Sequence, residues 1–104
     1  MSKGATVSVL YPRTATSTFN LDYYLSTHMA LVSKTWKDKG MKSWSVTQFG
    51  EGSPYSTHCL MEWESLEAFG KAAAEDDTKA VMADIENFSN EKPILIQGSV
   101  VGRS

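Results

Sequence analysis

The chain has little of what marks the specialised classes of protein. It contains one cysteine, Cys59, among 104 residues, so it cannot form an internal disulfide. No apolar run approaches the length of a membrane-spanning helix, and the N-terminus lacks the charged and then apolar pattern of a signal peptide. These absences together predict a reducing, cytoplasmic setting.

An excess of charge of one sign is also missing. Ten basic residues stand against twelve acidic ones, which leaves a formal net charge of -2 and no basic stripe of the kind that binds nucleic acid. The same balance gives no reason to expect a membrane partner. With 41% hydrophobic and 21% charged residues, the composition is that of an ordinary globular protein. The length predicts one domain over residues 1–104.

Motifs that bind metals, phosphates or dinucleotides are absent from the sequence. The stretch Gly50–Gly52 indicates a hairpin turn and not a phosphate loop, and no zinc spacing or serine-hydrolase elbow occurs. His58 and Glu62 could join His28 in a metal triad, but four residues along a strand separate them by about 13 Å, too far for one ion. We therefore expect no metal and no organic cofactor.

The sequence FNLDYYLSTHMALVSKTW, from Phe19 to Trp36, predicts a long helix. Asn20 is suited to the N-cap, because its side-chain oxygen can accept from the free N–H groups of the first turn. Phe19 and Tyr24 have the spacing of a hydrophobic staple. Gly40 supplies the left-handed conformation in which helices commonly end.

This helix carries one ionisable group on its apolar side. At about 100° per residue, His28 lies in the middle of an apolar stripe, while Tyr23 falls well off it. The helix is therefore expected to direct His28 inward. The stripe consists of Leu21, Tyr24, Leu25, Leu31, Val32, Thr35 and Trp36.

Alternation of period two predicts the strands, which cover Ala5–Tyr11, Lys42–Gly50, Tyr55–Glu64 and Ile94–Val101. Two shorter helices are expected, one capped by Ser65 and one starting near Asp77. The order strand, helix, strand, strand, helix, strand is typical of ferredoxin-like α+β folds, with a four-stranded antiparallel sheet and both helices on one face.

The strands are apolar on both of their faces, which such a sheet alone does not explain. In the third strand, Cys59, Met61 and Trp63 share one face, while Leu60 lies on the other. A sheet that is covered by helices on one side and still apolar on the other needs a second cover. We predict a homodimer in which two sheets face each other as an α/β barrel. The alternative is a monomer with a partly apolar face.

Four segments of the sequence resemble those of a known family: VLYP (Val9–Pro12), FNLDYYLSTHMALV (Phe19–Val32), WESLEAF (Trp63–Phe69) and DIENFSNEKP (Asp84–Pro93). In this order they resemble the EthD family of dimeric α/β-barrel proteins. The resemblance implies the dimeric α/β-barrel fold. It also implies a pocket between the long helix and the helix-covered side of the sheet. His28 matches the family's helix histidine.

The resemblance also implies a class of chemistry. The wider superfamily includes cofactor-independent monooxygenases, polyketide cyclases, muconolactone isomerases and haem-binding peroxidases. The expectation is a small cofactor-independent enzyme of catabolic or secondary metabolism. It would act on an apolar or aromatic small molecule by cyclisation, isomerisation, decarboxylation or oxygenation. His28 and Tyr24, one of the family's paired tyrosines, would be catalytic. The expected ligand-binding residues are Leu25, Val32, Trp36, Trp44, His58, Phe69, Met82 and Phe88.

Three alternatives stay open at this level. The chain could be a non-catalytic carrier of a small hydrophobic molecule, it could bind haem through His28, or His28 could be a satisfied core residue. An acid–base pair inside the cavity would favour the enzyme, and a lone imidazole among apolar walls would favour the carrier. The sequence shows one inward imidazole and no inward carboxylate on the long helix.

Overall fold

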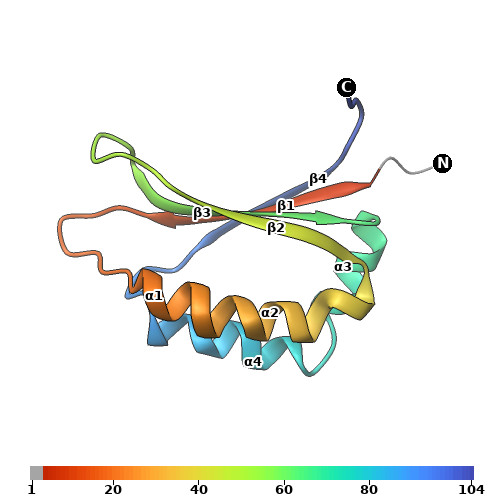
Figure 1. The fold of residues 1–104 in the computed structure, drawn as a ribbon, viewed down its shortest axis with the longest axis horizontal. Coiled ribbons are helices and arrows are strands. Elements are labelled where there is room, and N and C mark those ends of the chain that lie inside the picture. Colours follow the sequence, from red (N-terminus) through yellow and green to blue (C-terminus); the bar gives the residue numbers. More distant parts are fainter. Residues whose placement is uncertain (1–3) are drawn as a thin grey trace.

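The computed structural model describes residues 4–104, and within them a four-stranded antiparallel sheet carries helices on one face (Figure 1). The strands are β1 (Ala5–Pro12), β2 (Met41–Gln48), β3 (Tyr55–Trp63) and β4 (Ile94–Ser99). Their order across the sheet is β2-β3-β1-β4. This is the ferredoxin-like α+β arrangement, and it confirms the predicted fold class.

One helical segment of changing pitch connects β1 to β2. Its parts are α1 (Leu21–Tyr23), the π-helical turn η1 (Tyr24–His28), α2 (Met29–Trp36) and the 3-10 turn η2 (Lys37–Lys39). The segment begins and ends at the capping residues that the sequence predicts. Asn20 Oδ1 accepts a hydrogen bond of 3.1 Å from the Tyr23 N–H, and Gly40 has a left-handed φ of 119°.

The connection from β3 to β4 contains two α-helices and a 3-10 turn: α3 (Leu66–Ala73), α4 (Thr78–Ala83) and η3 (Asp84–Asn87). Ser65 caps α3 as predicted, because its Oγ accepts from the Ala68 N–H at 3.0 Å. Below the sheet in Figure 1, α4 runs beside the α1–α2 segment. This pair of helical segments faces the buried side of β1 and β3, where the core forms.

The core packs around aromatic rings at both ends of the helical layer. At one end Trp63, fully buried, lies 5.6 Å from the ring of Trp36 and 5.1 Å from that of Phe69. At the other end the rings of Phe19 and Tyr24 lie 5.0 Å apart, which is the contact that the staple spacing predicts. These edge and tilted contacts stabilise the entry and the exit of the first helical segment.

The opposite face of the sheet is bare in the described part of the chain, and it forms the upper surface in Figure 1. Leu10 pairs with Ile94 and His58, and the next row along the strands pairs Leu60 and Ile96 with Ser8, so these side chains share that face. Ile96 is 56% exposed. The apolar side chains that the strand pattern predicts on this second face are therefore present, and they lie among polar ones such as Ser8, Ser45 and Thr47.

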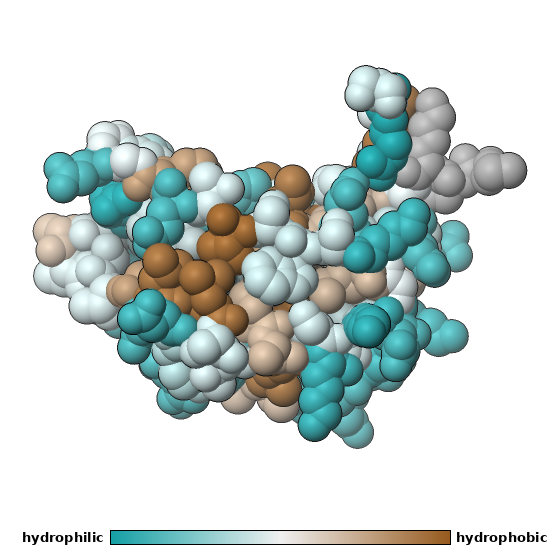
Figure 2. Space-filling view, in the orientation of Figure 1, coloured by the Kyte–Doolittle hydropathy of each residue, from teal (hydrophilic) through white to brown (hydrophobic). Residues whose placement is uncertain are grey.

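The last strand is shorter than predicted. It ends at Ser99, which pairs with Ala5, the first residue of β1. Val101 is 89% exposed. Figure 2 shows a second group of apolar side chains between the sheet and the first helical segment, on the face seen. Within residues 4–104 no helix is long and apolar enough to span a membrane.

Gly40 gives a first test of this fold. A Cβ there would lie 3.0 Å from Cβ of Ala68 at a φ of +119°, so Gly40→Ala should lower the free energy of unfolding by about 1–3 kcal/mol. Gly70, within α3, is the matched control. A Cβ there meets nothing within 4 Å, so Gly70→Ala should raise stability by about 0.5–1 kcal/mol. Urea denaturation measures both, and wild-type stability of Gly40→Ala would contradict the role of this glycine.

Candidate functional site

His28 lies against a small apolar cavity between the first helical segment and the sheet. Its side chain is buried, with 4% of the residue exposed. The helical segment contributes Tyr24, Val32 and Trp36 to the cavity, and the sheet contributes Val9, Cys59 and Met61. The cavity is partly open and small, with a volume of about 30 Å³. The expected inward direction of His28 is thus what the structure shows.

A π-helical turn sets the direction of the side chains before His28. The N–H of Met29 bonds the carbonyl of Tyr24, five residues back, so this turn holds one residue more than an α-helical turn. One extra residue shifts the preceding positions by about 100° around the axis. Tyr23 is thereby brought toward the side of His28, and Leu25 is turned to solvent. π-Helical turns occur frequently at functional sites.

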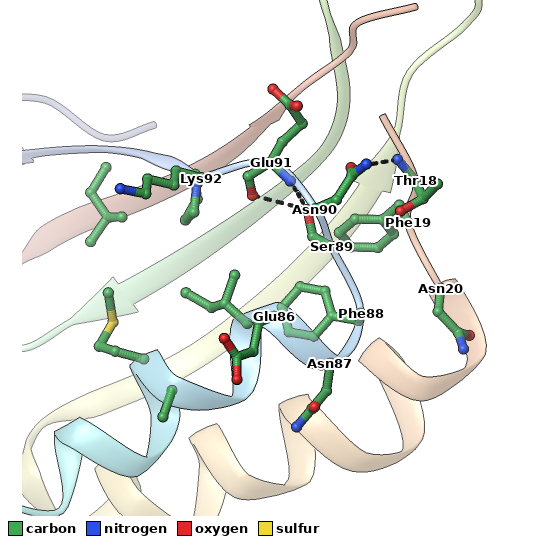
Figure 3. Close-up of a pocket in the computed structure, with 15 residues that line it drawn as sticks. Thr18, Phe19, Asn20, Glu86, Asn87, Phe88, Ser89, Asn90, Glu91 and Lys92 are labelled. Atoms are coloured by element: carbon green, nitrogen blue, oxygen red, sulfur yellow. Dashed lines mark hydrogen bonds between the residues drawn. The ribbon is translucent and has the colours of Figure 1, made fainter. Parts of the chain in front are cut away.

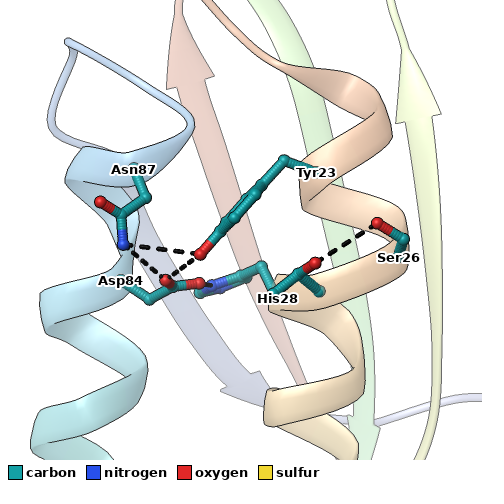
Figure 4. Close-up of polar contacts among 6 residues, drawn as sticks. Tyr23, Ser26, His28, Asp84 and Asn87 are labelled. Carbon is teal, nitrogen blue, oxygen red and sulfur yellow. Dashed lines mark hydrogen bonds and ion pairs between the residues drawn. The ribbon is translucent and has the colours of Figure 1, made fainter.

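The ring of His28 is held by a carboxylate from the other helical segment. His28 Nδ1 and Asp84 Oδ2 lie 2.9 Å apart, and both side chains are largely buried. The second carboxylate oxygen accepts from the Tyr23 hydroxyl at 2.5 Å and from the Asn87 amide at 2.9 Å. Figure 4 shows Tyr23 and His28 on one helical segment pointing toward Asp84 and Asn87 on the other.

These contacts set the charges of the pair. Burial lowers the pKa of His28 below its ordinary value, against the opposing influence of the nearby carboxylate. Partial burial works to raise the pKa of Asp84, but the donors Tyr23, Asn87 and His28 outweigh it and hold that pKa below its ordinary value. At neutral pH the pair is therefore a neutral imidazole beside a carboxylate.

This charge state fixes the tautomer of the imidazole. A carboxylate only accepts hydrogen bonds, so His28 Nδ1 carries the proton and donates a hydrogen bond to Asp84. Among the described residues the ring makes no other hydrogen bond, which leaves Nε2 with its lone pair free. An imidazole oriented in this way by a carboxylate is the arrangement of a general base.

Tyr24 lies beside His28 as predicted, with its ring stacked on the imidazole at 5.3 Å and 15° between planes. Burial first, and then the neighbouring Cys59 and Tyr11, raise the pKa of Tyr24 well above its ordinary value. The Tyr24 hydroxyl therefore keeps its proton at neutral pH. Burial also raises the pKa of the Cys59 thiol to about 11, so the thiol stays protonated and is a poor nucleophile.

The structure brings four of the expected ligand-binding residues to this site. Val32, Trp36 and Met82 line the cavity with His28. Phe88 contacts the imidazole directly, with 4.6 Å between ring centroids.

The other four expected ligand-binding residues lie elsewhere. Leu25 is 43% exposed because the π-helical turn rotates it away from the sheet. Trp44 is on the edge strand β2, where its Nε1 donates to Ser33 Oγ at 3.0 Å outside the cavity.

Phe69 and His58 also lie outside the cavity. Phe69 packs into the aromatic core against Trp63 and Trp36. His58 alternates onto the bare face of the sheet, where its ring stacks on Phe49 at 6.0 Å.

Sequence reasoning missed the three polar residues of the network around His28: Asp84, Tyr23 and Asn87. Asp84 is separated from His28 by 56 residues and lies on a different helical segment. Its spacing from Ile85 and Val81 in the sequence marks the edge of an apolar stripe, which was a usable signal. A helix of uniform pitch places Tyr23 well off the apolar stripe, whereas in the structure its hydroxyl donates to Asp84.

The site does not fit a haem. A cavity of about 30 Å³ has no room for the macrocycle, and the ring stacked on His28 is that of Tyr24. Within residues 4–104 no group of three histidine, cysteine, aspartate or glutamate side chains is placed to hold a metal ion.

Comparisons with known proteins bear on the fold. No protein-family model matches the chain, and the curated proteins give no match. An EthD-like protein from Ralstonia eutropha JMP134 aligns with a TM-score of 0.84 at 24% identity, over 100% of this chain and 97% of that chain. An EthD family protein from Bacillus halodurans C-125 aligns at 0.72 and 22% identity, over 94% and 99%. A dimeric ferredoxin-like protein of unknown function from Thermobifida fusca YX aligns at 0.63 and 15% identity, over 93% and 91%.

These likenesses show that the chain has the fold of EthD-like proteins. The resemblance that the sequence carries is thus confirmed at the level of the fold.

The charge state of His28 predicts how stability depends on pH. Folding lowers the pKa of His28 from its ordinary value of 6.5. The contribution of His28 to stability is therefore complete above pH 6.5 and is lost as the pH falls through the folded-state pKa. Asp84, whose ordinary pKa is 3.8, loses its contribution at more acidic pH. His28→Gln removes the first titration. Its unfolding free energy, from urea denaturation at several pH values, should fall less than that of the wild type between about pH 7 and pH 5. Equal slopes would contradict this assignment.

Proposed function

We propose that the chain is a small cofactor-independent enzyme of the EthD type, in which His28 removes a proton from an apolar or aromatic small molecule. One observation carries the proposal. The imidazole is held against an apolar cavity by a carboxylate that accepts from three donors. A carrier has no use for an oriented base, whereas acid–base catalysis needs one.

The protonation state narrows the type of reaction. A neutral imidazole with Nε2 free accepts a proton, which is the first step of aldol-type cyclisation, of isomerisation through an enolate and of oxygenation of an activated phenol. Decarboxylation requires a proton to be delivered to a carbanion, and a histidine whose pKa is lowered is seldom protonated near neutral pH. This protonation state therefore supports proton abstraction over decarboxylation.

The walls of the cavity narrow the type of substrate. Among the described residues that line it, there is no aspartate, glutamate, lysine or arginine. An ionised group that entered would lose its hydration without finding a counter-ion, which costs several kcal/mol or more. The reacting part of the substrate is therefore uncharged before the proton is removed. Tyr24 positions it, because its ring covers one side of the imidazole.

The test follows the proton directly. 2-Tetralone, an enolisable aromatic ketone, is incubated with the protein in D₂O, and incorporation of deuterium next to the carbonyl is followed by mass spectrometry. The wild type should accelerate exchange, and His28→Gln should return it to the rate in buffer. Asp84→Asn should slow it by about 10²- to 10⁴-fold, because the orienting carboxylate is lost.

His58→Gln serves as the control, since His58 lies on the other face of the sheet. Exchange by His28→Gln at the wild-type rate would overturn the assignment of the base. Saturable binding of the ketone without exchange would instead assign the chain to the carriers.

The proposal includes a homodimer formed through the bare face of the sheet. Leu10, Leu60 and Ile96 lie on this face, and His58 Nε2 is buried there without a hydrogen-bond partner in the described part of the chain. Both features are unfavourable in water and are relieved when a second surface packs on them. The similar protein from Thermobifida fusca is described as dimeric. Two such sheets packed face to face would bury about 800 Å² per partner or more.

Ile96 is the residue with which to test the dimer. Its side chain is 56% exposed in one chain, so Ile96→Asp should leave the fold intact while placing a charge in the interface. Light scattering at micromolar concentration should give a dimer mass for the wild type and a monomer mass for this variant. Leu25→Asp, which places the same charge on the helical side, should remain a dimer. A monomer mass for the wild type would refute the arrangement.

A further inference from the structure

An open groove lies next to the cavity that holds His28. It has a volume of about 920 Å³ and lies between the start of α1, the turn η3 and residues 89–93. Figure 3 shows Phe19 and Phe88 in its wall, together with the polar side chains of Glu86, Asn87 and Lys92. The groove is thus an apolar surface with a polar rim.

The groove and the cavity are separated by one set of side chains. Met82, Ile85, Pro93 and Leu95 line both of them. Met82 and Leu95 are exposed large apolar residues, so close packing does not lock them in one conformation. Methionine in particular has an unbranched, flexible side chain. These two side chains can therefore move aside for a ligand at small cost.

The two volumes differ in a way that restricts how a substrate can bind. Sites for small molecules usually measure about 300–1,000 Å³, which suits the groove at about 920 Å³ and not the cavity at about 30 Å³. A molecule larger than a few atoms cannot lie wholly beside His28. Its body must remain in the groove while its reacting end reaches the base.

The charges of the rim indicate an uncharged body. Glu86 and Glu91 stand against Lys92, so the lining carries one negative charge more than positive. Asn90 is already engaged, because its amide donates to the Thr16 carbonyl and its Oδ1 accepts from the Thr18 N–H, each at 2.8 Å. The groove thus lacks the cluster of cationic donors that a phosphate or carboxylate would need.

The groove also touches the residues that orient the base. Phe88 lines the groove and lies 4.6 Å from the imidazole of His28. Asn87 lines it as well and donates to Asp84 at 2.9 Å. A molecule in the groove therefore contacts the network that holds His28. How well the molecule fits the groove then affects the position of the imidazole.

We propose that this groove is the subsite for the body of the substrate, an elongated, uncharged aromatic or alkyl-aromatic molecule. Its reacting end passes between Met82 and Leu95 to His28. The inference rests on the proposed function of His28 and adds the class and the orientation of the substrate. It assigns discrimination among substrates to the groove and the proton transfer to the cavity.

The test uses phenol, 4-ethylphenol, 4-hexylphenol and the anion 4-hexylbenzoate as probes, with dissociation constants from calorimetry. Affinity should rise at least about tenfold from 4-ethylphenol to 4-hexylphenol, because the added methylene groups lie on the apolar wall. 4-Hexylbenzoate should bind at least about tenfold more weakly than 4-hexylphenol, because its carboxylate would enter a cavity whose described lining contains no lysine or arginine.

Leu95→Trp tests the passage. The larger ring should block it, so the affinity for 4-hexylphenol should fall at least about tenfold and exchange of 2-tetralone should cease. The matched control is Val101→Trp, at a position 89% exposed beyond the end of β4, which should behave as the wild type. Affinity that does not depend on chain length, or wild-type binding by Leu95→Trp, would overturn the subsite.

His28→Gln separates this inference from the proposed chemistry. It should lose exchange of 2-tetralone while it keeps the dependence of affinity on chain length. If the wild type shows no exchange but chain length and Leu95→Trp act as expected, the subsite stands and the proton transfer is wrong. If exchange depends on His28 but affinity ignores chain length, the base stands and the subsite is wrong.

Discussion

The contact between His28 and Asp84 is the interaction on which the rest of the site depends. It joins two residues that are 56 positions apart in sequence and lie on different helical segments, at 2.9 Å between Nδ1 and Oδ2. An imidazole buried against apolar walls is costly unless a polar group faces it. Asp84 is that group, and its second oxygen is itself satisfied by Tyr23 and Asn87. The carboxylate satisfies one ring nitrogen, and the other makes no hydrogen bond within the described residues.

The π-helical turn is what allows the helix to supply both tyrosines to this arrangement. In a helix of uniform pitch, Tyr24 would lie nearest to His28 and Tyr23 would face solvent. The extra residue in the turn brings Tyr23 to Asp84 while Tyr24 stays stacked on the imidazole. The same change removes Leu25 from the site, so periodicity alone could not assign these three positions. The role of Asp84 was not predicted for a different reason. Its contact with His28 spans 56 residues and depends on how two helical segments pack against each other.

Much more of the fold could be predicted from the sequence than of the site. The cap at Asn20, the left-handed stop at Gly40 and the cap at Ser65 are local signals, and each acts in the structure as its chemistry suggests. Strand order follows from the pattern of elements, because few topologies suit that pattern. The aromatic residues were harder to assign to the pocket or to the core from sequence. Phe69 and Trp44 are as aromatic as any pocket residue, and only tertiary packing places one in the core and the other on an edge strand.

The sheet separates chemistry from assembly by the alternation of its side chains. Along β3, Cys59 and Met61 face the cavity, while His58 and Leu60 lie on the bare face that we assign to the dimer. Neighbouring residues in one strand thus serve opposite surfaces, and a shift of the pairing by one residue would exchange them. The register of β1 against β3 therefore fixes both surfaces at once. Substitutions at one parity act on the site and those at the other on the association of subunits, so the two roles can vary independently on a single sheet.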